Sequence, residues 1–364
     1  MRVAYTLEQC WHRVPGGTAT AALEVARRLS GWPGVELVGV AARHRRPPDP
    51  SWAPPVPVRV LPLPRRALYE AWHGLRRPSV ERATGPVDVV HATGVAVPPR
   101  RAPLVVTVHD LAFLADRRRY TRHGVRFFMR ALELARRDAD LVLCSSEATR
   151  RECEAAGFDP SRLRVVPLGV RGRAAPAAAV TVARHRYGLA RDYVLWVGTA
   201  EPRKNLPVVV EAFRQLGRDD LDLVLVGPDG WHVDLPELVR PLGEQARLLG
   251  FLPVADLDAV TAGARAFCYP SLLEGFGLPV ADALVQGTPV VTSAGTATAE
   301  IVADGAGTAV DPRDPAAVAE ALGAILEDEA FAAGLVAAGR ARAAELTWER
   351  TAERTLAAYA EVVA

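Results

Sequence analysis

The chain has 364 residues, of which 49% are hydrophobic and 24% are charged. This length exceeds one ordinary core and suits two domains, and the composition excludes wholesale disorder. No stretch approaches the roughly 18 apolar residues of a spanning helix. Glu8 stands where a signal peptide would be apolar, so we expect a cytoplasmic protein. The cysteines form no CxxC pair and indicate buried thiols in a reducing compartment: Cys10, Cys144, Cys153 and Cys268.

The basic residues are 43 arginines and a single lysine, Lys204, and they are unevenly distributed. Residues 1–170 carry a net charge of +11, and residues 171–364 carry −9. The basic half could face anionic lipid, a phosphorylated acceptor or nucleic acid. The alternative is that arginine is simply the solubilising residue of this chain.

The first half alternates segments that are typical of strands and of helices. Strands are expected at 2–6, 35–40, 56–61 (within a Pro- and Arg-rich loop at 43–66), 87–91, 104–109, 141–144 and 163–166. Helices are expected at 18–29, 121–138 and 146–157. Continuous apolar runs joined by helices favour a parallel sheet covered on both faces.

The pattern breaks near residues 170–180 and then restarts. Further strands are expected at 193–197, 221–226, 246–249, 266–269 and 289–292, with helices at 205–217, 234–242, 255–263, 277–287 and 314–363. We predict the α/β class, with two doubly wound, Rossmann-like domains facing a cleft. The expected boundaries are a first domain at 1–170, a linker at 171–190, a second domain at 191–345, and a helix at 346–364 that returns to the first domain.

Several familiar motifs are absent from the sequence. There is no P-loop, no GxGxxG, no HExxH and no GxSxG. Three DxD triplets occur, but none follows an apolar strand, and we interpret them as helix-end residues. We therefore expect neither a metal site nor a dinucleotide-dependent dehydrogenase.

Arg203 and Lys204 lie at an expected helix start, after the strand at 193–197 that ends before Gly198. The free N–H groups of a helix start favour an anion, whereas a cation there is unfavourable unless an anion neutralises it. Because arginine serves elsewhere, the lysine suggests a compact ammonium that meets a phosphate. The alternative is ordinary exposed charge.

Glu274 precedes Gly275, Phe276 and Gly277, just before the expected helix at 277–287. The glycines allow a ligand to approach the backbone, and an ionised carboxylate accepts hydrogen bonds from hydroxyls. Asp282 follows eight residues after Glu274. The alternatives are a helix-dipole acid for Glu274 and an exposed helix acid for Asp282.

Together these segments resemble retaining glycosyltransferase family 4, which has the GT-B architecture, and within it bacterial mannosyltransferases. In the first half the matching segments are Gly16-Gly17, His109-Asp110, Ser145-Ser146-Glu147 and VVPLGV at 165–170. In the second half they are GTAEPRKNL at 198–206, LGFLP at 249–253, YPSLLEGFGLP at 269–279, GTPVV at 287–291, Ala299-Glu300 and Leu346-Thr347-Trp348.

The resemblance implies a nucleotide-sugar donor held mainly by the second domain and an acceptor on the side of the first domain. It implies that Arg203 and Lys204 contact the donor diphosphate and that Glu274 contacts the sugar hydroxyls. Asp282 stands where the family has a ribose-binding glutamate, and its side chain is one methylene shorter. The remaining residues that it assigns to the donor are Gly16, Gly17, Gly198, Phe251, Leu252, Gly275, Phe276, Gly277 and Leu278, with His109 near the transferred sugar. His109 and the Gly16-Gly17 pair also have purely structural interpretations.

The resemblance further implies transfer with retention and without metal or another cofactor. GDP-mannose is the favoured donor and a UDP-hexose the second choice. The acceptor is expected to be a glycan or a lipid-linked saccharide, with peripheral contact to the anionic inner membrane face and no nucleic-acid partner. Two alternatives stay open: a sugar-nucleotide epimerase or phosphorylase of the same architecture, and a non-catalytic sugar-nucleotide-binding module.

Overall fold

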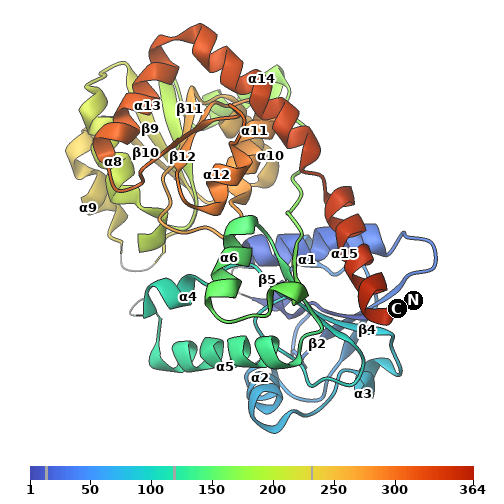
Figure 1. Ribbon diagram of the computed structural model, residues 1–364. Coiled ribbons are helices and arrows are strands. Elements are labelled where there is room, and N and C mark those ends of the chain that lie inside the picture. The colour runs from blue at the N-terminus through green and yellow to red at the C-terminus, as the bar shows by residue number, and fades with distance from the viewer. Residues whose placement is uncertain (13–14, 118–119, 231–232) are drawn as a thin grey trace. The chain divides into compact units, whose positions relative to one another are not determined.

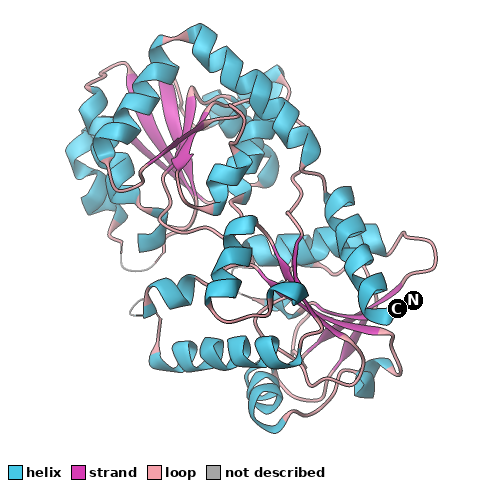
Figure 2. Cartoon of the chain, in the orientation of Figure 1, coloured by secondary structure: helices cyan, strands magenta, loops and turns pink. Residues whose placement is uncertain are grey.

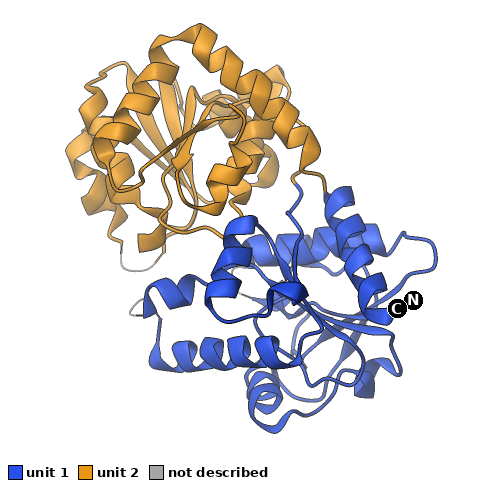
Figure 3. Cartoon of the chain, viewed as in Figure 1, with its two compact units in different colours: residues 1–169, 348–364 blue, residues 170–347 orange. Residues whose placement is uncertain are grey.

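The computed structural model describes residues 1–12, 15–117, 120–230 and 233–364, and the chain divides into two compact units. Unit 1 comprises Met1–Gly169 and Trp348–Ala364, and unit 2 comprises Val170–Thr347 (Figure 3). Each unit has strands at its centre and helices around them (Figure 2). Two parallel-sheet α/β domains confirm the predicted fold class.

The sheet of unit 1 has seven parallel strands in the order β3-β2-β1-β4-β5-β6-β7. They are β1 (Arg2–Thr6), β2 (Glu36–Ala41), β3 (Val58–Val60), β4 (Val89–Ala92), β5 (Leu104–Val108), β6 (Leu141–Cys144) and β7 (Leu163–Val165). The strands form where they do because apolar runs such as β6 are buried along their whole length. The order reverses direction between β1 and β4, and the carboxyl ends of these two neighbours meet there.

Helices cover both faces of this sheet (Figure 1). They are α1 (Gly16–Leu29), α2 (Arg65–Glu70), the π-helical segment η3 (Ala71–Leu75), α3 (Glu81–Thr84), α4 (Ala112–Ala115), α5 (Arg122–Asp138), α6 (Glu147–Ala155) and α15 (Trp348–Val363), with short 3-10 turns at Glu8–Trp11, Pro50–Trp52 and Pro160–Arg162. Thr121 caps α5 by accepting the N–H of Gly124, and Ser146 caps α6 by accepting that of Thr149.

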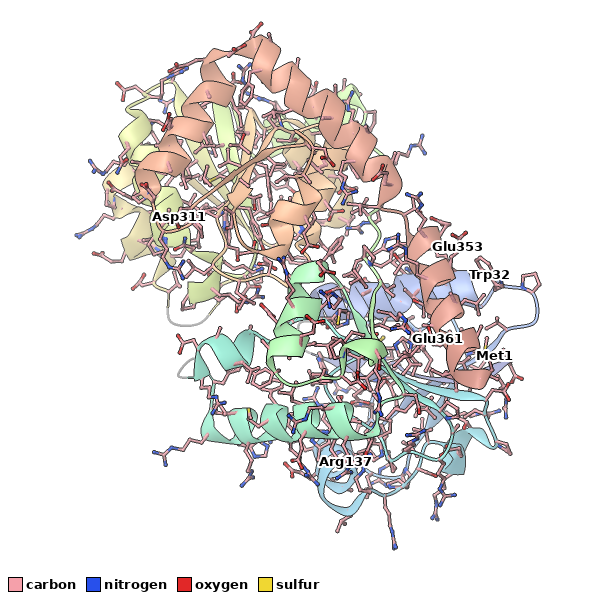
Figure 4. The ribbon with its side chains drawn as sticks, viewed as in Figure 1. Met1, Trp32, Arg137, Asp311, Glu353 and Glu361 are labelled. Atoms are coloured by element: carbon pink, nitrogen blue, oxygen red, sulfur yellow. The ribbon has the colours of Figure 1, made fainter. Side chains whose placement is uncertain are left out.

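The C-terminal helix α15 packs on unit 1 beside α1 and strands β4 to β6. A buried hydrogen bond of 2.6 Å joins Tyr359 Oη to His91 Nδ1 on β4, and Thr351 Oγ1 donates to the carbonyl of Pro167 at 2.8 Å. At the surface, Glu361 (labelled in Figure 4) pairs with Arg164, with 3.1 Å between Oε2 and Nε. Burial lowers the pKa of His91 to about 3, so this helix docks on a neutral imidazole.

The sheet of unit 2 has six parallel strands in the order β10-β9-β8-β11-β12-β13. They are β8 (Asp192–Val197), β9 (Leu221–Val226), β10 (Ala246–Gly250), β11 (Ala266–Tyr269), β12 (Val290–Ser293) and β13 (Thr308–Val310). The connections run outward in opposite directions from β8 and β11. Because such connections are right-handed, the helices that follow β8 and β11 cover opposite faces.

The helices of unit 2 are α7 (Ala177–Arg186), the 3-10 turn η6 (Pro202–Lys204), α8 (Leu206–Leu216), α9 (Leu235–Val239), the 3-10 segment η7 (Arg240–Gln245), α10 (Val254–Ala262), α11 (Leu278–Gln286), α12 (Ala297–Ile301), α13 (Pro315–Glu327) and α14 (Glu329–Glu345). On one face α8 packs with α13, and on the other α11 packs with α10 and α14. No helix in the described part of the chain is both long and apolar enough to cross a membrane.

The structure differs from the sequence predictions in several elements. Helix α7 occupies half of the expected linker at 171–190, and the expected helix at 314–363 is three helices. Asp328 explains one break, because its side chain accepts the N–H of Phe331 at 2.9 Å and caps a new helix. Strand β3 is shorter than predicted, and α2, α3, α4, α12 and β13 were not predicted because short segments give little periodic signal.

Candidate functional site

The two strongest sequence signals follow the two strands that flank the switch in strand order of unit 2. Residues 198–204 come directly after β8, and residues 270–277 come directly after β11. In open α/β sheets, ligands bind outside the carboxyl ends of the strands at this position. The topology therefore brings Arg203 and Lys204 to Glu274, 70 residues further along the chain from Lys204.

Glu274 is the centre of a set of side chains that we call the charged cluster: Glu201, Arg203, Lys204, Tyr269, Ser271 and Glu274. Four donors converge on its Oε1 atom. The distances are 2.5 Å from Lys204 Nζ, 2.9 Å from Ser271 Oγ, 3.1 Å from Tyr269 Oη and 3.3 Å from Arg203 Nη1. Lys204 also hydrogen-bonds Tyr269 Oη. The cluster balances two cations against two carboxylates.

Lys204 is buried at 8% exposure, which rules out the alternative of ordinary exposed charge. It ends the turn η6, and Asn205 in the left-handed conformation (φ 59°) separates it from α8. Its ammonium therefore lies beside β11, over the Tyr269 ring at 5.0 Å, instead of in solvent. Arg203 is the more exposed cation, with 26% of its side chain accessible.

Burial and charge act in opposite directions on the cluster. Burial raises the pKa of Glu274, but Lys204 and Arg203 outweigh burial, so its net pKa is below the ordinary value and the carboxylate is ionised. Burial lowers the pKa of Lys204, and Glu274 opposes that shift. The two residues therefore remain an ion pair because each stabilises the charged form of the other.

The two loops of the site are joined by hydrogen bonds that sequence reasoning missed. Glu201 Oε1 lies 2.8 Å from Arg203 Nε, and Ser271 Oγ, whose single hydrogen is shared with Glu274, lies 3.0 Å from the Arg203 carbonyl oxygen. Asn205 Nδ2 donates to the carbonyl of Pro270 at 2.9 Å. Only their position in strand-end loops, beside the predicted residues, could have indicated them. These bonds fix the loop that carries Lys204 against the loop that carries Glu274.

Close packing against a side chain or the backbone explains three glycines of the candidate site. At Gly277 (φ 104°), which precedes α11, a Cβ atom would lie 2.5 Å from Thr298 Cγ2. At Gly227 (φ 140°), after β9, it would lie 1.8 Å from the carbonyl oxygen of Gly198. The unpredicted residues Gly227 and Gly230 therefore allow the backbone at 198–200 to pack closely.

The other residues of unit 2 that are predicted to bind the donor lie in or near these loops in the sequence, but they are not members of the charged cluster. Phe251 follows β10 and is 77% exposed, whereas Leu252 and Phe276 are buried. Gly275 and Leu278 flank Phe276 and Gly277 at the start of α11. Among the described contacts, none links Asp282 to the cluster.

Asp282 is half-buried on α11. Burial raises its pKa to about 6, with Arg171 opposing the shift and Asp258 adding to it. Its assignment to the ribose stays a prediction.

Gly16, Gly17 and His109 belong to unit 1. Helix α1 begins at Gly16 itself, in a positive-φ conformation (64°), two residues earlier than predicted. His109 follows β5, and its Nε2 lies 3.3 Å from the carbonyl oxygen of Thr93. Burial lowers its pKa, and Asp110 partly offsets this, so the ring is neutral.

Two doubly wound domains, one with charged loops at its switch point, define the GT-B architecture of glycosyltransferases. Residues 15–171 match the family described as Glycosyltransferase Family 4, and residues 184–342 match Glycosyl transferases group 1. The chain belongs to the family 4 glycosyltransferases.

Similar proteins agree with this assignment. O-antigen chain mannosyltransferase B of Escherichia coli is 32% identical over 282 residues, covering 74% of each chain. D-inositol 3-phosphate glycosyltransferase of Salinispora arenicola is 31% identical over 393 residues, covering 96% of this chain and 88% of that one. The solved structure of Anabaena Alr3699/HepE in complex with UDP and glucose has the same fold, with a TM-score of 0.78 and 18% identity over 99% of this chain and 100% of that chain.

Proposed function

We propose that the chain is a retaining hexosyltransferase that moves mannose from GDP-mannose to a hydroxyl of a glycan or lipid-linked acceptor. The charged cluster at the switch point of unit 2 is the observation that carries this proposal. Unit 2 holds the donor and unit 1 the acceptor. A UDP-hexose is the second donor candidate.

Donor cleavage breaks the bond between the anomeric carbon and the phosphate oxygen, and the electron pair leaves with the phosphate. Fixed positive charge at that oxygen lowers the barrier, because it stabilises charge that develops in the transition state. Arg203 is partly exposed and Lys204 is buried, so the diphosphate meets Arg203 first and then Lys204 at the end of η6. These two cations take the role that a metal ion has in other transferases.

Glu274 orients the sugar. Its Oε1 atom is occupied by four donors, so Oε2 is the oxygen that accepts a sugar hydroxyl. The low pKa of the buried carboxylate keeps it an acceptor over the neutral pH range. The acceptor oxygen then bonds to the anomeric carbon on the face that the phosphate leaves, and its proton passes to the departing phosphate oxygen. This front-face route needs no covalent nucleophile and retains the configuration.

The relatives support mannose as the transferred sugar, since one of them is named as a mannosyltransferase. The described residues contain no group of three or more His, Cys, Asp and Glu side chains arranged to hold a metal.

The test is a thermal-shift panel of GDP, UDP, TDP and ADP sugars, followed by a transfer assay with the best donor in the presence and absence of EDTA. We expect the largest shift with GDP-mannose and unchanged turnover in EDTA. A larger shift with a UDP-hexose would transfer the proposal to that donor. Activity that is lost in EDTA and restored by manganese would contradict the role given to the two cations.

Glu274→Gln separates sugar recognition from nucleotide recognition. We expect turnover to fall far more than the affinity for free GDP, because the carboxylate contacts the sugar and not the base. An equal loss of both would contradict this role.

A further inference from the structure

Unit 1 contains an apolar pocket beside its own switch in strand order. The pocket has a volume of about 180 Å³, and its described lining residues all belong to unit 1, between Gln9 and Ala135 in the sequence. Its walls come from the loop after β4 (Val95 and Val97), from the end of β5, and from α5 (Phe128, Ala131 and Leu132). Because it opens at the carboxyl ends of parallel strands, it occupies the position at which such sheets bind ligands.

The described lining does not suit an anion. None of the described lining residues is a lysine or an arginine, and the carboxylate of Asp110 accepts the N–H of Ala112 at 3.0 Å. His12 also lines the pocket and could carry a positive charge. Burial, together with Arg65 and His44, lowers the pKa of His12 to about 4, so its ring is neutral. Gln9 is already engaged, because it donates to Thr93 Oγ1 at 2.7 Å. The rings of Phe113 and Phe128 stack at 5.2 Å and add apolar surface.

His109 is a polar residue of the lining that can receive a hydroxyl. His109 Nε2 faces the Thr93 carbonyl, which can only accept, so the neutral ring carries its hydrogen there. The Nδ1 atom therefore keeps its lone pair and can accept a hydrogen bond from a hydroxyl. A pocket that combines apolar walls with a few directed polar groups is typical of a small-molecule site.

We propose that the acceptor carries an apolar group of about six carbons next to the hydroxyl that receives the sugar, and that this pocket holds that group. A cavity of about 150 Å³ accommodates a benzene molecule, so the volume here suits a phenyl ring or a short alkyl segment. Val95 is 50% exposed, so a longer chain can continue out of the pocket past it. The inference rests on the proposed function and deepens it by naming the acceptor class.

The experiment titrates the full chain with methyl, phenyl and hexyl α-mannosides, observed by NMR of its labelled valine and leucine methyl groups. We expect the phenyl or hexyl glycoside to bind at least tenfold more tightly than the methyl glycoside, with saturable shifts at Val95, Val97 and Leu132. Preference for hexyl indicates a lipid acceptor, and preference for phenyl indicates an aromatic one. Equal affinities for the three, or no saturable shift with any, would overturn the proposal.

Two variants place the binding in the pocket. Val95→Asp adds a charge at a half-exposed lining position and should remove the tenfold preference. Val60→Asp, at a position of unit 1 that is 55% exposed and outside the lining, should preserve it. Ala131→Phe fills the pocket and should abolish the methyl shifts. A preference that survives both lining variants would also overturn the proposal.

Thermal shifts with GDP-mannose and UDP-hexoses on the same samples distinguish the two proposals. If the apolar glycosides bind and no sugar nucleotide does, the proposed function fails while the pocket remains a binding site. If the sugar nucleotides bind and the apolar preference is absent, only the acceptor inference fails.

Discussion

At the scale of single residues, Lys204 and Glu274 are expected to contribute both to stability and to turnover, and the two contributions can be measured separately. Lys204→Met keeps the apolar stem, but it leaves Glu274 with Arg203 as its remaining cation. We expect a loss of about 1–3 kcal/mol in the free energy of unfolding, because a buried carboxylate loses a charged partner. We also expect turnover to fall by roughly 100- to 1000-fold, because the substitution removes a hydrogen-bond donor to the departing phosphate.

The double variant Lys204→Met/Glu274→Gln is the control. It should recover most of the lost stability in chemical denaturation, because no unpaired charge stays buried, while turnover stays low. If the double variant regained activity together with stability, or if the Lys204→Met variant had the parent rate of turnover with saturating donor, Lys204 would have a structural role only.

Asp282 allows a test of the ribose contact. If its carboxylate holds the ribose diol, Asp282→Ala should weaken nucleotide binding by roughly 1–3 kcal/mol, the cost of losing a charged hydrogen-bond partner. Asp282→Glu should bind at least as well as the parent, because it restores the longer reach. A 2′-deoxy donor should lose affinity in the parent and no further affinity in Asp282→Ala. Parent-like binding by Asp282→Ala in calorimetry would place the ribose contact elsewhere.

The raised pKa of Asp282 also predicts a pH dependence of stability. Its pKa of about 6 in the folded chain exceeds the ordinary value of 3.8. Between these values the folded state binds more protons than the unfolded state, so stability falls as the pH rises through this window. Asp282→Asn removes the titration and should be more stable than the parent by ~2–3 kcal/mol at pH 8 but not at pH 4. Denaturant unfolding at both pH values checks this, with the exposed Asp219→Asn as the control.

At the scale of elements, the loop after β8 is held in place by the loop after β9. Gly227→Ala would put a methyl group against the carbonyl of Gly198, 1.8 Å away, and must displace the backbone that leads to Arg203. We expect a loss of donor binding of at least tenfold in titration calorimetry, beyond any loss of stability.

Gly217→Ala is the matched control for that variant. Gly217 also has a positive φ (61°) in unit 2, but a Cβ atom there meets nothing within 4 Å. It should cost ~1–2 kcal/mol of stability through backbone strain alone and leave donor affinity unchanged. Equal donor affinity in both variants would show that the 198–204 loop does not depend on this packing.

At the scale of the whole molecule, the exposed arginines of unit 1 predict contact with anionic lipid. Arg122, Arg126, Arg136 and Arg137 of α5 are exposed, and Arg137 is labelled in Figure 4. We expect the full chain to bind phosphatidylglycerol vesicles weakly at low ionic strength and to lose this binding in salt, since each basic residue near such a surface contributes ~1 kcal/mol. Sedimentation with vesicles measures it.

Arg122→Glu/Arg126→Glu should abolish the vesicle binding. The control, Arg240→Glu/Arg313→Glu, makes the same charge change at exposed positions of unit 2 and should retain it. Equal behaviour of the two double variants, or indifference of the parent to lipid charge, would leave arginine as solubilising charge only.

The sequence by itself determined the fold class and the segments of the site. Parallel strands buried on both faces are continuous apolar runs, so β6 and β11 were evident from the order of residues in the sequence. Glycines and charges directly after such runs identified the loops that carry Arg203, Lys204 and Glu274, because ligand groups collect at strand ends.

Only the tertiary structure decided which of these groups meet. An apolar run predicts burial but not its neighbours, so the strand order around β8 and β11 could not be read from the sequence. For the same reason a lysine at a turn looked exposed, although a carboxylate 70 residues away makes its burial possible. Hydrogen bonds and close backbone contacts act over a few ångströms, and only the folded chain brings such distant residues that close.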